Sequence, residues 1–528
     1  MRSCWERNTD RLADRPWAVL GSLTALLLML PGAGAAEEYE VWLSDQANTQ
    51  GITTENPNGT HGGKIRIYEG SDLEQNPPIN SPTVLDVTAD LFPTALATTG
   101  AHVARIHGVV PSPDHVYMAL NFVASGHLGI VDGRTKKPVC LFRTTGTSTG
   151  RQNHMSFWTP DGHHIIVANQ NGRILERVDV VRNEEGVPER FAFNGAASLD
   201  LVGGPGRVLG QPVAVDTDET DGIACQVTGL VADGQPTTTP TGAAKQAPGI
   251  RVANAPICPV PTSTGRHAFV TLGGGGMFVV DITASPMAIV AEYDLSVIRA
   301  AGCGGAEGDG FMHLNTGTSG PNVSEFSLYR FALNYPSAPA FNTANTPAPV
   351  AVWQDKDNGK IGGNQIPAGS NRDAHGVVIV RNPESGAAGY LHQMDRIRNN
   401  VEVFKLSPPW DDLNKRYEGT YNLTTSGACG GTVGTTRTND PTPDLGDFSP
   451  STGQTGGRIY VALRGPFPLT ISHAADGSCP GLGIIDLSSN RRSGSLSAVM
   501  ETTVLNADES RNLSDPHAAI VRKKTSVN

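Results

Sequence analysis

The chain has 528 residues and a net charge of −11, with 17% charged and 6% aromatic residues. Its 61 Gly and 37 Pro exclude coiled coils and helical bundles, because both need long periodic stretches rich in Ala, Glu, Lys and Leu. Apolar residues at 38% exclude wholesale disorder. The acidic balance and the lack of a basic run exclude nucleic acid as a partner. Many short strands joined by Gly/Pro turns fit this composition best.

The N-terminus has the pattern of a secretory signal. Basic residues such as Arg2 and Arg15 precede an apolar run from Trp17 to Leu30, and the small residues Ala33-Gly34-Ala35 follow as a cleavage site. The apolar run is shorter than the roughly 20 residues that a membrane span needs. We therefore expect a signal peptide over residues 1–35 and a periplasmic or secreted mature chain with no membrane span.

Six cysteines follow the predicted signal peptide: Cys140, Cys225, Cys258, Cys303, Cys429 and Cys479. An even number of cysteines in an oxidising compartment predicts disulfides. Cys429 and Cys479 flank a Gly/Thr-rich segment that a disulfide could close. For Cys258 and Cys303 two roles stay open, a disulfide or ligation of a metal, and the first is favoured.

A loose repeat runs through the mature chain. Residues 105–120 and 153–168 each contain a short strand, a Ser/Thr-Pro-Asp turn and a second apolar strand. A third strand that ends in Asp and a fourth returning strand follow each pair. Four strands in roughly 45 residues is the period of a β-propeller blade.

The repeat predicts an all-β, seven-bladed β-propeller over residues 36–528. Its last unit, at 515–521, supplies one strand, and strands near 40–44, 64–68 and 83–87 would complete that blade and close the sheet edges. The interval between 154 and 258 leaves room for an eighth blade. Segments near 200–252, 336–370 and 406–445 are interpreted as loop insertions.

Groups able to bind a metal recur at the first position of the repeat. The first strand of each blade lines the channel, so residues distant in sequence converge there. These residues are His107, His154, Cys258, Cys303, His375, Asp447 and His517. Neutral imidazoles held close together readily share a metal ion. We expect the four histidines to be the metal ligands, with copper as the first choice and iron as the second.

Four further residues complete the predicted site. Asp447 would be a ligand or proton acceptor, and Arg105, two residues before His107, would hold an anionic substrate. Asp373 and Asp515 each stand two residues before a candidate histidine, where a carboxylate could accept the second imidazole N–H. The histidines could equally hold ordered water in a polar channel, which leaves two other functions open: a non-catalytic binding propeller and a metal-free lactonase-like hydrolase. The sequence contains no Walker, dinucleotide-binding or H-E-x-x-H motif.

The turn pattern and the blade arrangement resemble the exported bacterial seven-bladed propellers of the YVTN-repeat and nitrous-oxide-reductase-like group. Some members of that group carry copper at the channel mouth on histidines from several blades. The resemblance implies that His107, His154, His375 and His517 have this role. The paired-His segment and the cupredoxin domain of nitrous oxide reductase are absent.

The sequence thus predicts a periplasmic, metal-dependent propeller oxidoreductase that acts on a small-molecule substrate at the channel mouth. A soluble periplasmic electron carrier would be its redox partner.

Overall fold

A computed structural model describes residues 38–46, 62–202, 208–231, 253–295, 297–298, 303–320, 323–337, 347–356, 359–361, 372–381, 388–406, 416–430, 439–449, 456–465, 477–502 and 514–524. The predicted signal peptide lies outside the described residues. Residues Glu37–Asn528 form one compact unit. None of the helices in the described ranges is long and apolar enough to cross a membrane.

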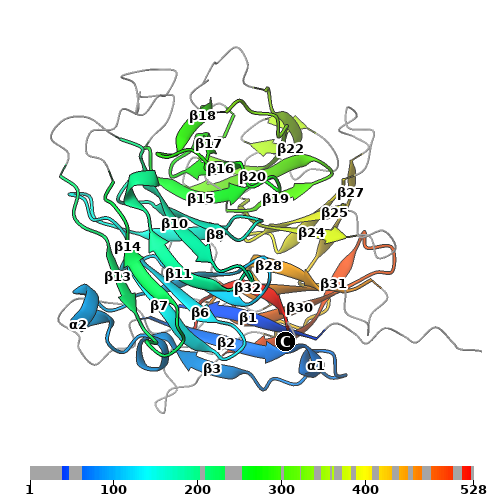
Figure 1. Ribbon diagram of the computed structural model, residues 1–528. Coiled ribbons are helices and arrows are strands. Elements are labelled where there is room, and N and C mark those ends of the chain that lie inside the picture. Colours follow the sequence, from blue (N-terminus) through cyan, green and yellow to red (C-terminus); the bar gives the residue numbers. More distant parts are fainter. Residues whose placement is uncertain are drawn as a thin grey trace, which may run out of the picture. The chain divides into compact units, whose positions relative to one another are not determined.

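The described strands form six sheets, of which one has eight strands and consists of two four-stranded halves (Figure 1). A single parallel pairing, Leu445 with Ala518, joins the two halves. Counted separately, these halves and the five other sheets make seven groups, each built around four antiparallel strands. This is the architecture of a β-propeller.

The strands of the seven groups follow one another along the chain, except that the last strand returns to the first group. The first group is β32 (Pro516–Lys523), β1 (Tyr39–Asp45), β2 (Lys64–Glu69) and β3 (Thr83–Asp86). The second is β4 (Ile106–Pro111), β5 (Tyr117–Phe122), β6 (His127–Asp132) and β7 (Lys137–Arg143), and the third is β8 (Asn153–Trp158), β9 (His164–Asn169), β10 (Ile174–Arg182) and β11 (Pro188–Phe193). The fourth is β15 (Pro256–Pro261), β16 (His267–Leu272), β17 (Met277–Asp281) and β18 (Ala288–Tyr293).

The remaining groups have the same order. The fifth is β19 (Gly305–Gly308), β20 (Phe311–Gly320), β21 (Val323–Phe331) and β22 (Val350–Lys356), extended by β23 (Gly359–Ile361). The sixth is β24 (Ala374–Arg381), β25 (Ala388–Asp395), β26 (Asn400–Lys405) and β27 (Tyr417–Asn422), and the seventh is β28 (Pro443–Ser449), β29 (Arg458–Leu463), β30 (Gly481–Leu487) and β31 (Gly494–Glu501). Short helical segments are α1 (Gly70–Leu73), the π-turn Val87–Leu91, α2 (Ala95–Thr99) and the 3₁₀ turn Gly195–Ala197.

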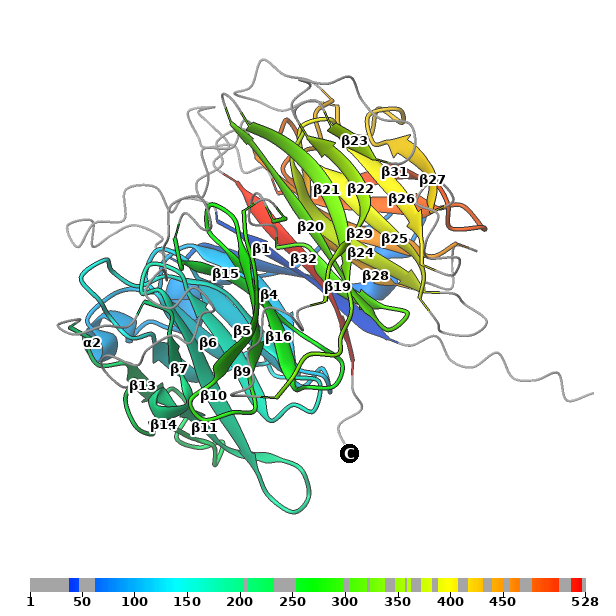
Figure 2. The same ribbon diagram turned by 90° about the horizontal axis from the view of Figure 1, so that it is seen from above.

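The two ends of the described chain pair with each other, as predicted. β1 and β32 are antiparallel, with Val41 opposite Val521, and they lie side by side in both views (Figures 1 and 2). The C-terminal strand therefore completes the N-terminal sheet and covers an edge that would otherwise be open.

The Ser/Thr-Pro-Asp turns form as the sequence predicts. Asp114 accepts a hydrogen bond from the amide of Val116 at 3.1 Å, and Asp161 accepts one from the amide of His163 at 3.0 Å. In each turn the preceding hydroxyl, of Ser112 or Thr159, also donates to the aspartate. These side chains satisfy backbone groups at the tight connection between the first two strands of a blade.

Segments interpreted as loop insertions contain strands. Residues 208–231 carry β13 (Val213–Asp216) and β14 (Ala224–Val227), which pair with β7 and β11 and widen two sheets. β22 and β27, the fourth strands of their sheets, lie within 336–370 and 406–445. β27 is an outer strand with several half-exposed side chains, so it lacks the apolar run by which the inner strands are recognised.

Candidate metal centre

The first strands of the groups contact one another in sequence: β4 touches β8, β8 touches β15, β24 touches β28, β28 touches β32, and β32 touches β4. The same kind of backbone irregularity occurs in six of these strands. The pairing register shifts around residues 107, 154–155, 257–258, 375–376, 444–445 and 517. At a register shift, a side chain points in a different direction from the one that the regular alternation of the strand would give it. These positions include the four predicted histidines and Cys258.

The four predicted histidines are in one cluster. The ring centroids of His107 and His517 are 3.6 Å apart and the rings are stacked. His154 lies edge-on to His107 at 4.5 Å, and His375 lies edge-on to His517 at 5.4 Å. Neighbouring strands of three sheets and the returning strand β32 thus bring these imidazoles together, as the repeat predicts.

Hydrogen bonds orient two of the imidazoles. His517 donates from Nδ1 to the carbonyl oxygen of His107 at 2.8 Å, which leaves the lone pair on Nε2. The side-chain amide of Gln46, just after β1, lies 3.0 Å from His107 Nδ1. Rotated by half a turn, this amide would accept the Nδ1 proton and leave His107 Nε2 with its lone pair. Both Nε2 atoms are buried and have no hydrogen-bond partner among the described residues.

A buried aspartate completes the cluster. Asp444 of β28 touches His375 Nδ1 with Oδ1, and its Oδ2 lies 3.9 Å from His517 Nε2. The three residues offer ligand atoms that all lie within 4.8 Å of one another. A carboxylate against one imidazole nitrogen fixes the tautomer of a ligating histidine, so Asp444 can serve either as a ligand or as the group that orients His375.

Buried ion pairs surround Asp444. Arg464 donates to it at 2.7 Å and also binds Asp515 at 2.6 Å, while Arg396 lies 3.3 Å from Asp444 and 2.8 Å from Asp373. Both guanidinium groups therefore contact Asp444, and each also binds a second carboxyl. They hold the Asp444 carboxylate in place against the imidazoles.

Burial keeps His107, His154 and His517 in the form that binds metals. It lowers the pKa of His107 and of His517 well below the usual value, and for His107 the neighbouring imidazoles add to the effect. Burial likewise lowers the pKa of His154 to about 3. Although burial opposes it, interactions with His375 and Arg396 hold the pKa of Asp444 well below its usual value. At neutral pH these three imidazoles therefore offer lone pairs, and Asp444 offers a carboxylate.

The predicted aspartate lies elsewhere on β28. Asp447 accepts hydrogen bonds from the amides of Phe448 (2.8 Å) and Val521 (3.1 Å), and burial raises its pKa to about 6. The structure places the Asp447 carboxylate against backbone amides of β28 and β32, three positions along β28 from Asp444, the residue at the register shift.

Arg105 lies directly before β4 with a positive φ of 55° and is half-buried. Burial lowers its pKa, and the charge of Asp515 opposes that shift. Arg105 is therefore near the carboxylate that also binds Arg464, at the edge of the cluster, and a role in holding a substrate stays a prediction.

Cys258 and Cys303 form a disulfide, with their Cα atoms 5.4 Å apart. The other two pairs are Cys140–Cys225 and Cys429–Cys479, so the expectation of three disulfides is confirmed. In the disulfide state neither Cys258 nor Cys303 is a thiolate ligand.

Sequence reasoning missed Asp444 and Gln46. Asp444 has the same place in its strand as His107, because it directly follows the residue that pairs with the end of the second strand, Leu463, just as His107 follows Ile106, which pairs with Phe122. This equivalence is visible only in the strand pairing. Gln46 has no equivalent in the repeat.

The fold and this cluster define the protein as a β-propeller with a buried set of imidazoles where its inner strands converge. No protein-family model matches the chain, and no curated protein matches its sequence. Solved structures with a similar chain path include a periplasmic gluconolactonase from Pseudomonas aeruginosa, with 13% identity, a TM-score of 0.46 and coverage of 92% of this chain and 99% of the other. A protein from Lactobacillus plantarum has 10% identity, a TM-score of 0.43 and coverage of 92% and 99%. A dihydro-heme d1 dehydrogenase has 10% identity, a TM-score of 0.39 and coverage of 91% and 74%. The narrower YVTN-repeat grouping stays a prediction.

Proposed function

We propose that the protein is a metal-dependent β-propeller oxidoreductase, with copper, or else iron, held by His107, His154, His375 and His517. One observation carries the proposal: the stacked His107 and His517 each bury an Nε2 atom without a hydrogen-bond partner among the described residues. Leaving such a group unsatisfied costs about 1–3 kcal/mol. Two adjacent unsatisfied imidazole nitrogens beside a carboxylate fit a bound cation, which would offset that cost.

The donor set is compatible with a redox metal. Imidazole suits copper, iron and zinc alike, and zinc would bring no redox chemistry. When bound, copper or iron would supply one-electron chemistry to a small substrate and pass electrons to a soluble carrier. Asp444 would orient His375 through the Nδ1 contact, and Arg464 and Arg396 would in turn hold Asp444 in place.

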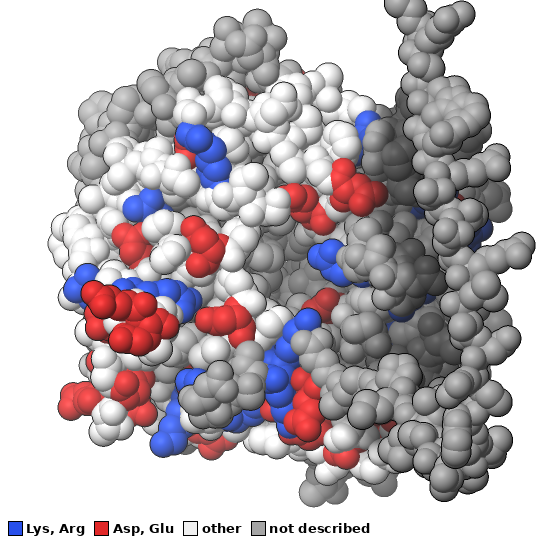
Figure 3. Space-filling view, turned by 45° about the vertical axis from the view of Figure 1, so that its right-hand side comes forward, with Lys and Arg blue, Asp and Glu red and all other residues white. Residues whose placement is uncertain are grey.

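Three disulfides fit an oxidising compartment, so the protein would act after export. Among the described residues on the face shown in Figure 3, acidic and basic side chains are interspersed. Near the cluster, Arg105 is a candidate to hold an anionic group of a small substrate.

The test is metal content by mass spectrometry on protein purified from the periplasm of an expressing cell. The comparison is between the wild-type protein, the double variant His107→Ala/His375→Ala and the control His163→Ala, whose side chain is exposed in a turn between β8 and β9. We expect stoichiometric copper or iron in the wild-type and control proteins and its loss from the double variant.

Absence of metal from all three proteins, also after incubation with Cu²⁺ or Fe²⁺ and with unchanged melting temperatures, would remove the metalloenzyme proposal. A non-catalytic binding propeller would then be the favoured function. Hydrolysis of a lactone that a chelator leaves unchanged would instead support the lactonase-like alternative.

A further inference from the structure

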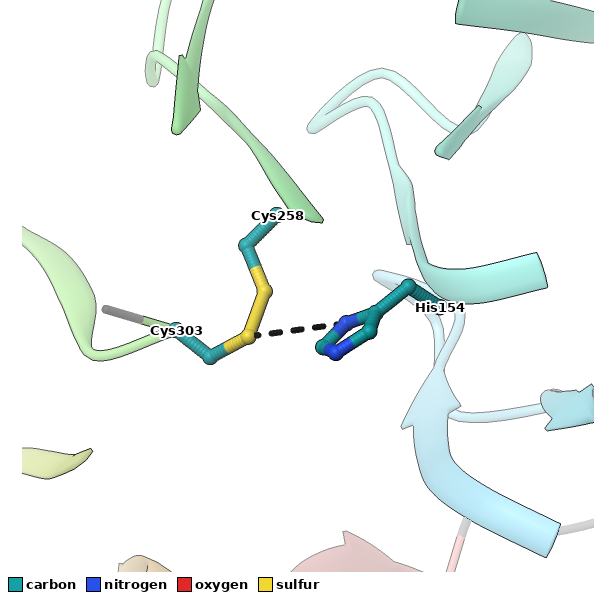
Figure 4. Close-up of side chains that lie close together, drawn as sticks. All are labelled: His154, Cys258 and Cys303. Atoms are coloured by element: carbon teal, nitrogen blue, oxygen red, sulfur yellow. Dashed lines mark hydrogen bonds between the residues drawn. A yellow bond between two sulfur atoms is a disulfide. The ribbon is translucent and has the colours of Figure 1, made fainter. Parts of the chain in front are cut away.

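The Cys258–Cys303 disulfide lies against one of the clustered imidazoles. Cys258 is at the register shift in β15, and Cys303 stands just before β19. The ring of His154 points at this disulfide, with Nδ1 3.9 Å from Cys303 Sγ (Figure 4). One nitrogen and both sulfurs lie within 4.8 Å of one another.

All three disulfides pack among apolar side chains. Cys140–Cys225 joins β7 to β14, in a cluster that includes Phe142 and Phe191. Cys429–Cys479 lies beside the hydroxyl of Ser478. Among the described residues, the Cys258–Cys303 pair alone belongs to a group of histidine, cysteine and acidic side chains close enough to share an ion.

The geometry of this group suits a tetrahedral cation once the S–S bond is broken. With Zn–S and Zn–N bonds of about 2.3 and 2.0 Å, a sulfur and a nitrogen on one zinc ion are about 3.5 Å apart. The observed 3.9 Å between His154 Nδ1 and Cys303 Sγ is within half an ångström of that separation. The two sulfurs would have to part to about 3.8 Å, which rotation about the Cα–Cβ bonds can provide across a Cα–Cα distance of 5.4 Å.

We propose that reduction of the Cys258–Cys303 disulfide creates a second metal site, in which His154 and the two thiolates bind a soft or borderline cation such as Zn²⁺ or Cu⁺. The reductant is a small dithiol: its two sulfurs close into a disulfide, and its two electrons and two protons convert Cys258 and Cys303 into thiols. Binding of the cation then releases those two protons to solvent. Three protein ligands leave a fourth position for water on a zinc ion.

Access to this site favours attack at one sulfur. Cys303 is 7% exposed, whereas Cys258 is fully buried. His154 is only partly buried, so a small dithiol or a cation would approach from the side of His154 and Cys303.

The proposed site at His154, Cys258 and Cys303 does not depend on a metal at the four histidines. If that metal is present, however, both sites would compete for His154. A cation bound at Cys258 and Cys303 would then weaken metal binding at the four histidines. This consequence alone rests on the proposed function.

The test uses the folded full-length protein, reduced under anaerobic conditions with a small dithiol that is then removed. Alkylation and peptide mapping establish which cysteines are free, and Co²⁺ serves as the probe. We expect free Cys258 and Cys303, one Co²⁺ bound tightly, and intense thiolate-to-cobalt charge-transfer bands that the unreduced protein lacks. Zn²⁺ should displace the Co²⁺ and remove the bands.

Variants assign the ligands. The bands should persist in Cys140→Ser/Cys225→Ser, the matched control, and disappear in Cys258→Ser/Cys303→Ser. His154→Ala keeps the disulfide and should lower the affinity for Co²⁺ at least tenfold after reduction, while His163→Ala should not. His107→Ala/His375→Ala should retain the bands, so the outcome is separable from that of the histidine metal site.

Three results would overturn the proposal. The first is a disulfide that the dithiol leaves intact in the folded protein. The second is free Cys258 and Cys303 thiols without thiolate bands. The third is an equal Co²⁺ affinity in the wild-type protein and His154→Ala.

Discussion

At the scale of single residues, Asp444 combines two roles that can be measured separately. It touches His375 in the cluster, and it compensates the buried guanidinium groups of Arg464 and Arg396. Removal of one partner from a buried ion pair leaves an uncompensated charge, which is costlier than the loss of an exposed pair. Asp515 and Asp373 still face the two arginines in a variant, and they would limit the loss.

We therefore expect Asp444→Asn to lower the free energy of unfolding by about 3 kcal/mol at neutral pH, measured by urea denaturation of metal-free protein. Glu418→Gln is the matched control, because Glu418 pairs with the half-exposed Arg492 at 3.3 Å and such a pair contributes about 0–1 kcal/mol. Equal losses in the two variants would show that Asp444 does not neutralise the buried arginines.

At the scale of strands, close approach at the cluster depends on a glycine. Gly376 follows His375 in β24, and a Cβ atom at this position would stand 2.1 Å from the carbonyl oxygen of Asp444 in β28. Backbone atoms cannot yield as a flexible side chain would, so Gly376→Ala must separate the two strands that hold His375 and Asp444.

We expect Gly376→Ala to lower the free energy of unfolding by about 1–3 kcal/mol and to reduce the metal content of protein purified from the periplasm. The control is Gly430→Ala, where an added Cβ would meet nothing within 4 Å. Urea denaturation and mass spectrometry check the two effects. Unchanged stability and metal content in Gly376→Ala would mean that β24 and β28 can part without cost.

The repeat predicted the strands and the cluster better than it predicted the connections. The Ser/Thr-Pro-Asp turns and the flanking apolar strands fix the register of the second and third blades, so the positions of His107 and His154 follow from the sequence. β28 leads into Ser449-Pro450-Ser451, which lacks the aspartate of that turn motif, and an alignment on Asp447-Phe448-Ser449 placed the aspartate three residues too late. The register shift at 443–446 is a backbone feature that no residue pattern in the sequence marks. Asp444 could therefore be identified only from the structure.

At the scale of the whole molecule, the described chain buries many ionisable groups that the cluster does not use. Burial lowers the pKa of His127 and of His313 to about 3 and that of His392 to about 4. His392 is fixed in its neutral form, since its Nε2 donates to the carbonyl of Arg491 and its Nδ1 accepts from the hydroxyl of Tyr421, each at 3.0 Å. Each of these three histidines takes up a proton more readily in the unfolded chain, where its pKa is about 6.5.

The folded pKa values lie below the unfolded value, so the unfolded chain binds more protons between about pH 4 and pH 6.5. The stability that neutral His392 contributes is therefore complete above pH 6.5 and is lost as the pH falls towards 4. We expect His392→Gln, which keeps one donor and one acceptor, to reduce the slope of unfolding free energy against pH by about 1.2 kcal/mol per pH unit near pH 5. Urea denaturation of metal-free protein from pH 4.5 to 7.5 measures this slope, with the exposed His163→Gln as the control. Parallel curves for the wild-type protein and His392→Gln would show that His392 is protonated in the folded protein as readily as in the unfolded chain.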